Sequence, residues 1–214
     1  MALSEPVERE LMHSRDITVR GYFRADGLLD VDARLVDTKP YGFANSDRGE
    51  IEPGRPLHEM LVRMTINEAL VIVACEAETV HGPYANCGGG AARMGELVGL
   101  AIKAGFLKAA NDRLRGAAGC THIRELLQQV ATVAHQTLWP VRSRREARAL
   151  AAARQRDPAA AVVGEDDGSL RLLNTCFAYA SDGAVVRQRW PQFYTGPAAP
   201  AAVNPDAVTR IAAA

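Results

Sequence analysis

The chain has 214 residues, 48% of them hydrophobic, and its 25 basic residues balance its 25 acidic ones. This size and apolar content are typical of one folded domain with a sizeable core, and the zero net charge argues against nucleic-acid and anionic-membrane partners. No apolar run reaches the roughly 20 residues that cross a bilayer, and the acidic residues 1–10 hold no hydrophobic signal segment, so we expect a cytoplasmic protein.

The first part of the chain predicts an antiparallel sheet of about four strands. Apolar and charged side chains alternate along residues 29–37, which is the period of a strand with one buried face. The polar stretch 41–56 is expected to be a loop. The predicted strands are 17–22, 29–37, 57–66 and 70–80.

Charges of both signs alternate along the first two predicted strands and their turn. We interpret them as a ladder of cross-strand ion pairs on the solvent-exposed face of the sheet, in which each pair contributes little stability. The residues are Arg20, Arg24, Asp26, Asp30, Asp32, Arg34 and Asp37.

Beyond Gly88-Gly89-Gly90 the apolar period changes from that of a strand to that of a helix. Three helices are predicted, over 94–102, 106–114 and 123–138, the last ended by Pro140 because proline cannot continue the hydrogen-bond ladder. A charged, solvated helix is expected over 144–156, and a late β-hairpin over 170–180 and 184–190.

These elements predict an α+β fold, with the antiparallel sheet packed on one face by a cluster of three to four helices. We expect a single domain over residues 1–195, followed by an Ala/Pro-rich, disordered tail over residues 196–214.

Cys120 and His122 stand two residues apart, just after Gly119 and just before a helical pattern. The free N–H groups and partial positive charge of a helix start favour a thiolate. The sequence therefore predicts that this thiol and imidazole take part in catalysis or metal binding.

Cys87 also follows a turn and precedes a helix, so both thiols can approach the same end of the sheet. Cys87, Cys120 and His122 would suit zinc or iron, with His58 as a further ligand or as an acid/base group. Free cysteine is also a common buried apolar residue, so a metal site, a metal-free site and a structural role all stay open.

The other histidines and cysteines are interpreted as structural. His13, His81 and His135 show no pattern that indicates chemistry, and His135 is expected to pack on its helix. Cys75 lies within a strand and Cys176 in the late hairpin, and both are expected in the core.

Several blocks of the sequence together resemble a bacterial family of unknown function, numbered 2889. The resemblance covers nearly the whole chain except the tail, and it implies a single domain and the importance of Cys87, Cys120 and His122 without implying a reaction. A weaker similarity is to iron–sulfur scaffold proteins, which also place cysteines at helix starts. The blocks are Arg15–Ile17 with Tyr22, Arg24–Leu28, Asp32–Asp37, Leu57–Met60, Pro83-Tyr84 with Cys87, Gly119–His122 with Glu125-Leu126, and Asn174–Cys176.

The sequence shows no nucleotide-binding glycine motif and no serine-hydrolase or zinc-protease motif. We therefore expect a small-molecule enzyme of the lyase, hydratase or isomerase type, without a redox cofactor, that acts on a partly apolar metabolite at Cys120, His122, His58 and Cys87. The alternative is a metal-binding or iron–sulfur accessory protein without turnover, and a third hypothesis is an interaction module. The cofactor is left open, with zinc or iron expected for a metal, as is the choice between a monomer and a homo-oligomer.

Overall fold

The computed structural model describes residues 3–156 and 172–197. The chain divides into two compact units, Met1–Gln155 and Arg156–Ala214, each described here by itself. The single domain predicted over 1–195 stays a prediction, and most of the predicted tail lies outside the described residues.

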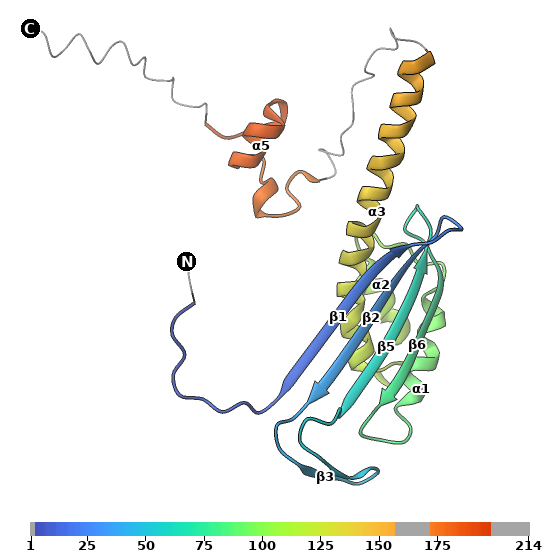
Figure 1. The fold of residues 1–214 in the computed structure, drawn as a ribbon, viewed down its shortest axis with the longest axis vertical. Coiled ribbons are helices and arrows are strands. Elements are labelled where there is room, and N and C mark those ends of the chain that lie inside the picture. Colours follow the sequence, from blue (N-terminus) through green and yellow to red (C-terminus); the bar gives the residue numbers. More distant parts are fainter. Residues whose placement is uncertain (1–2, 157–171, 198–214) are drawn as a thin grey trace, which may run out of the picture. The chain divides into compact units, whose positions relative to one another are not determined.

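The first unit contains the predicted four-stranded antiparallel sheet, in the order β1-β2-β5-β6 (Figure 1). Each strand pairs with its neighbours in a continuous antiparallel register, with irregularities near both ends of the β5–β6 ladder. The α+β class is therefore confirmed. The strands are β1 (Ser14–Phe23), β2 (Leu29–Thr38), β5 (His58–Ile66) and β6 (Ile72–His81).

The segment expected to be a loop contains a small separate hairpin, β3 (Phe43–Asn45) and β4 (Gly49–Ile51). The side chain of Asn45 accepts hydrogen bonds from two backbone N–H groups of the turn, and Gly49 adopts a positive φ of 71°. These two features close a tight turn in a polar stretch that lacks strand periodicity.

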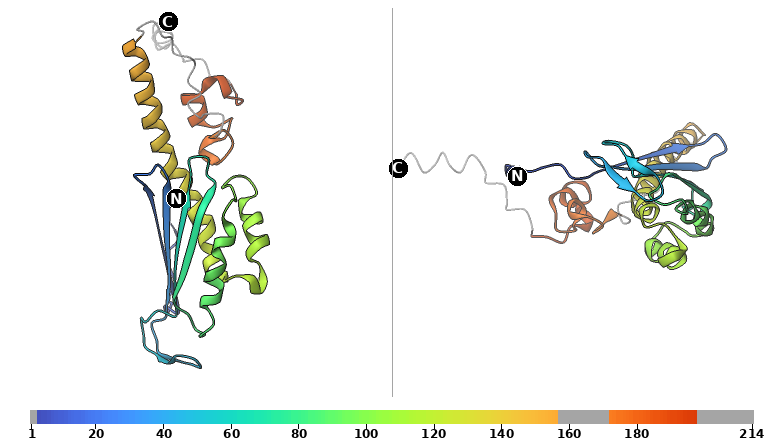
Figure 2. Two further views of the ribbon diagram at one scale, coloured as in Figure 1. Left: turned by 90° about the vertical axis from the view of Figure 1, so that its right-hand side faces the viewer. Right: turned by 90° about the horizontal axis from the view of Figure 1, so that it is seen from below.

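One face of the sheet carries the hydrophobic core. Along β2 every second side chain is buried, and the helices cover this face (Figure 2). The buried residues of β2 and β5 on this face include Leu29, Val31, Ala33, Leu35, Met60, Val62, Met64 and Ile66.

The opposite face carries the predicted ladder of ion pairs. Arg34 pairs with Glu59 across β2 and β5 at 2.6 Å, and Arg63 pairs with Asp32 at 2.7 Å. Ion pairs between strands are therefore present on this face, but these two join β2 to β5 and do not link the charged residues of the first two strands to one another.

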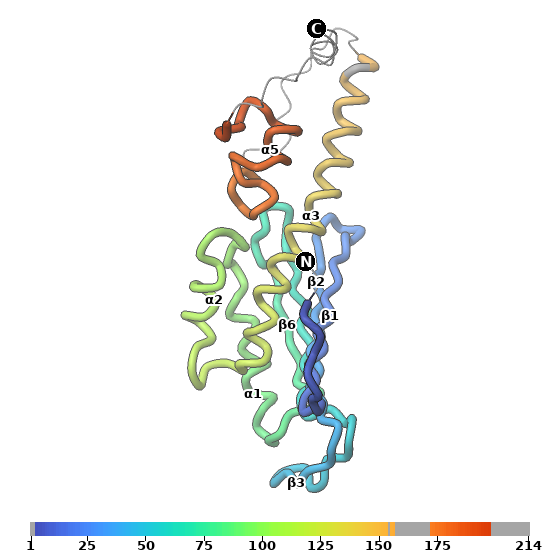
Figure 3. The backbone as a smooth tube through the Cα atoms, turned by 90° about the vertical axis from the view of Figure 1, so that its left-hand side faces the viewer, coloured from blue at the N-terminus to red at the C-terminus, as the bar shows by residue number. Residues whose placement is uncertain are grey.

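The longest helix, α3 (Thr121–Arg156), runs through Pro140 without ending, so the predicted stop at Pro140 is wrong (Figure 3). Beyond the proline, Arg142 donates to the carbonyl of Glu68 and Arg145 pairs with the Glu68 carboxylate. These contacts with the β5–β6 turn stabilise the helix where the proline removes a backbone bond.

None of the helices in the described ranges has the length and apolar content that a membrane crossing requires.

The helix predicted over 94–102 begins and ends earlier in the chain than expected, at Gly88 and Leu97. It consists of α1 (Gly88–Ala91) and a 3₁₀ turn, η1 (Ala92–Leu97), after which Gly99 adopts a φ of 87° and the chain becomes extended. The predicted helix α2 (Phe106–Leu114) is confirmed.

The second unit is helical in its described part, so the predicted late hairpin is wrong over residues 172–190. It contains η3 (Phe177–Tyr179), α5 (Ala184–Arg189) and η4 (Pro191–Phe193). A short apolar run fits a strand and a buried helical turn equally well, and here Val186 is fully buried on α5. Cys176 is exposed rather than in a core.

Helix α3 packs closely on β1 at Gly21, where a Cβ atom would lie 2.9 Å from Thr137 Cβ and closer still to Thr137 Oγ1. We expect Gly21→Ala to lower the free energy of unfolding by about 1–3 kcal/mol, because the helix must move away from the strand. Chemical denaturation measures the change. Thr137→Ala in the same chain should recover part of it, whereas equal stability of Gly21→Ala and wild type would contradict the close packing.

Candidate functional site

Polar side chains replace the apolar core at the end of the sheet where β2 ends and β5 begins. Arg15, Asp37 and His58 are direct cross-strand neighbours on β1, β2 and β5. Because alternate residues of a strand share a face, Asp37 lies on the buried side that also carries Leu35. The row therefore brings a cation, a carboxylate and an imidazole together under the helices.

Asp37 is the centre of the cluster, and only 1% of its side chain is exposed. Arg15 binds both of its oxygens, with Nε and Nη2 each at 2.7 Å, and His13 Nε2 lies 3.3 Å from Oδ1. Burial raises the pKa of Asp37, but the hydrogen bonds and charge of Arg15, with help from His58 and His13, outweigh it and hold the pKa below its ordinary value. Asp37 is therefore ionised at neutral pH.

His58 contacts the same carboxylate through Nδ1, which lies 2.9 Å from Asp37 Oδ2. An ionised carboxylate only accepts hydrogen bonds, so we assign the proton of neutral His58 to Nδ1. Its Nε2 then carries a lone pair that is free to accept a proton.

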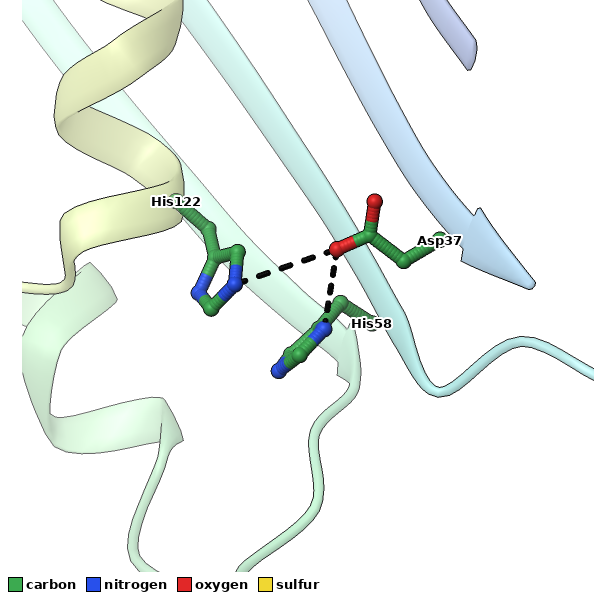
Figure 4. A group of neighbouring side chains, drawn as sticks. All are labelled: Asp37, His58 and His122. Atoms are coloured by element: carbon green, nitrogen blue, oxygen red, sulfur yellow. Dashed lines mark hydrogen bonds and ion pairs between the residues drawn. The ribbon is translucent and has the colours of Figure 1, made fainter. Parts of the chain in front are cut away.

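His122, in the first turn of α3, stacks on His58 with ring centroids 3.8 Å apart and planes 29° apart (Figure 4). Its Nε2 lies 3.8 Å from Asp37 Oδ2. Burial lowers the pKa of both histidines; for His58 the neighbouring charge of a protonated His122 lowers it further, and for His122 the charge of Arg15 does so. Both imidazoles are therefore neutral at neutral pH.

Cys120 lies at the start of α3, where its carbonyl accepts the first helical hydrogen bond, from Arg124 N–H at 3.0 Å. Its Sγ is 3.8 Å from His122 Nδ1. Helix α1 packs directly on this turn, since a Cβ atom at Gly90 would lie 2.8 Å from Cys120 N. The predicted pair of Cys120 and His122 is thus in contact.

Cys87 lies just before α1 and packs on Gly82, which follows β6. A Cβ atom at Gly82 would lie 2.7 Å from Cys87 Cβ and 3.0 Å from its Sγ. This contact places Cys87 beside the chain that leaves β6.

The three side chains whose donor atoms converge within 4.8 Å are Asp37, His58 and His122, and in residues 3–156 and 172–197 no other such set of His, Cys, Asp or Glu occurs. This set shares His122 with the predicted metal ligands Cys87, Cys120 and His122, and it includes His58, which was predicted as a further ligand. The roles predicted for the two cysteines stay predictions.

Sequence analysis missed Asp37, Arg15 and His13. Asp37 was assigned to the exposed ion-pair ladder, although its odd number places it on the same side of the strand as Leu35. That parity was the available signal. No pattern marks His13, whose contact with Asp37 depends on how β1 pairs with β2.

A surface hollow of about 580 Å³ lies away from this cluster, on the outer face of the sheet. Its lining includes Arg34 and Arg63, whose charges are already paired with Glu59 and Asp32. Because these groups stabilise each other across the strands, we place the functional site at the Asp37 cluster instead.

Comparison with known proteins gives one family. A family model described as "Protein of unknown function (DUF2889)" matches residues 13–136, which include the whole cluster but end before the similarity noted at Asn174–Cys176. No curated protein matches, and no solved structure matches.

Loss of the buried charge should cost more than loss of an exposed one on the same strand. We expect Asp37→Asn to lower the free energy of unfolding by about 3 kcal/mol, because Arg15 keeps its charge without a buried partner. Asp32→Asn, which breaks an exposed pair, should cost less than about 1 kcal/mol. Urea denaturation compares them, and equal costs would contradict a central role for Asp37.

The two histidines should make the protein less stable in mild acid. In the folded protein the pKa values of His58 and His122 lie below the ordinary value of about 6.5. Below that pH these two side chains therefore bind more protons in the unfolded chain than in the folded one. The free energy of unfolding should therefore fall as the pH drops from about 6.5 towards the lower folded pKa values, while Asp37 acts only in stronger acid.

Denaturation curves at several pH values measure this slope. His58→Gln and His122→Gln should each reduce it. His135 is exposed on α3, so the prediction that it packs against its surroundings is wrong, and His135→Gln should leave the slope unchanged. The same slope in all four proteins would contradict the burial effect.

Proposed function

We propose that this chain, which belongs to the DUF2889 family of proteins of unknown function, is an enzyme that moves protons on a small, partly apolar metabolite. The reaction is of the hydratase, lyase or isomerase type and needs no redox cofactor. The observation that carries the proposal is the stacked pair of neutral, partly exposed imidazoles, His58 and His122, beside the buried Asp37 carboxylate.

His58 is the general base in this proposal. Its Nδ1–H is held by Asp37, so Nε2 can accept a proton, and the adjacent carboxylate stabilises the resulting imidazolium. Arg15 in turn fixes the orientation of the carboxylate through two hydrogen bonds.

His122 is the second acid/base group. The ring centroids are 3.8 Å apart, so protonation of one imidazole disfavours protonation of the other. Starting from two neutral rings, the pair therefore takes up one additional proton at a time. A pair that takes one proton and returns it suits isomerisation and the addition or removal of water, which begin and end at the same protonation state.

Cys120 supports His122 through the contact between Sγ and Nδ1. Apolar side chains begin at the next inward-facing pair, Leu35 and Met60, which are both buried. This boundary between polar and apolar groups fits a partly apolar substrate. Cys87 completes the predicted set as a residue near this end of the sheet.

The alternative of an iron–sulfur accessory protein is less well supported. Iron–sulfur clusters are held mainly by cysteine thiolates, and the donors that converge in the described part of the chain include none. The cytoplasmic location stays a prediction from the sequence, and the choice between a monomer and a homo-oligomer stays open.

Proton transfer can be tested without a known substrate. The protein is incubated in D2O with a panel of small hydroxy, unsaturated and carbonyl acids, and proton NMR detects deuterium exchange, hydration or isomerisation. We expect one class of compound to react, with the rate reduced by about 100-fold or more in His58→Gln and in His122→Gln. The rate should rise with pH as the histidines lose their protons.

His135→Gln is the matched control and should keep full activity, because this histidine is exposed on the same helix as His122. Cys120→Ser tests the supporting thiol and should reduce the rate less than either cluster histidine variant. Full activity in both His58→Gln and His122→Gln would overturn the proposal.

A further inference from the structure

We infer that Asp37, His58 and His122 bind one divalent transition-metal ion through Asp37 Oδ2, His58 Nδ1 and His122 Nε2. The inference deepens the proposed function, on which its catalytic meaning rests. Binding of the ion itself is measured without a substrate, so the two proposals can fail separately.

The spacing of the three donor atoms fits a metal ion. Zinc binds histidine nitrogen and carboxylate oxygen at about 2.0–2.2 Å, so two ligands of a tetrahedral ion lie roughly 3.4 Å apart. Here Oδ2 lies 2.9 Å from His58 Nδ1 and 3.8 Å from His122 Nε2, and all three donors lie within 4.8 Å. Side-chain shifts of a few tenths of an ångström would bring them to coordination distance.

The lone pairs of the three donor atoms can also be directed at a metal ion. Asp37 Oδ2 accepts one hydrogen bond from Arg15 Nη2 and one from His58 Nδ1–H. An ion replaces only the proton of His58, which moves to Nε2 and leaves the Nδ1 lone pair for the metal. Neutral imidazole is the form that coordinates metals, and both rings are neutral at neutral pH.

The charged and polar groups around the three ligands also favour a bound cation. Arg15 holds the carboxylate from behind and also pairs with Glu125 on α3, so two carboxylates and one guanidinium leave a net negative charge around the ion. Cys120 Sγ lies beside Nδ1 of His122 and can orient that ring.

Three protein ligands leave coordination positions for water or substrate, which is the arrangement of catalytic rather than structural sites. Two histidines and one carboxylate are a ligand set used by zinc hydrolases and by non-haem iron enzymes. The side chains of His58 and His122 are 13% and 24% exposed, so the open positions face solvent. With the ion bound, His58 and His122 are ligands, and a water molecule on the ion, rather than an imidazole, would take the proton in the proposed reaction while the ion polarises a carbonyl.

The test is isothermal titration of the chelator-treated full chain with Zn²⁺ at neutral pH. We expect one ion per chain, and an affinity reduced about 100-fold or more in His58→Ala and in His122→Ala, since even outer-shell changes cost 10–100-fold. His135→Ala should bind as the wild type does. Circular dichroism establishes that each variant is folded.

The cysteines supply the competing ligand set. Cys87→Ser and Cys120→Ser should keep one bound ion with less than about 100-fold loss of affinity, because neither thiol is a ligand in this proposal. The wild-type protein loaded with Co²⁺ should show ligand-field bands without a thiolate charge-transfer band. This measurement needs no variant and therefore does not depend on how well any variant folds.

Three results would overturn the inference: no binding of Zn²⁺ to the wild type, unchanged affinity in the folded His58→Ala and His122→Ala variants, or a thiolate band in the Co²⁺ spectrum. Deuterium exchange by chelator-treated protein would support the proposed enzyme while leaving the ion without a catalytic role. Binding of Zn²⁺ with no reaction in the substrate panel would support the ion alone.

Discussion

The contact between Arg15 and Asp37 joins the parts of the first unit on which the site depends. Arg15 extends from the edge strand β1, binds both oxygens of Asp37 on β2, and reaches Glu125 on α3. Burying a carboxylate costs several kcal/mol unless it is paired and hydrogen-bonded, and here the guanidinium supplies both. Without it, an ionised Asp37 could not stay under the helices, and His58 would lose the acceptor that sets its tautomer.

The two histidines of the cluster are held in place by different contacts. His58 belongs to the sheet and is held by the carboxylate at 2.9 Å, whereas His122 belongs to the helix and is held by stacking and by Cys120. One ring is therefore fixed by a charged hydrogen bond and the other by weaker contacts.

Local periodicity was enough to predict the four strands, their antiparallel pairing and the covered face, because alternation along 29–37 is unambiguous. Predictions from local periodicity were wrong where contacts between residues distant in the sequence determine the structure. Helix α3 continues through Pro140 because Arg142 and Arg145 reach Glu68, and residues 172–190 are helical although their short apolar runs also fit strands. Of the site, Cys120, His122 and His58 were predicted, but their convergence on Asp37 depends on how α3 lies on the sheet.

Arg15, which pairs with Asp37 in the cluster, lies on β1, an edge strand of the sheet. Arg15 and Glu125 are 110 positions apart in the chain, and within the described residues β1 pairs with β2 alone. Edge strands with few contacts open locally at a lower free energy than the rest of a domain. Local opening of β1 would separate Arg15 from Asp37 and so disrupt the cluster, and amide hydrogen exchange along β1 would measure how often this occurs.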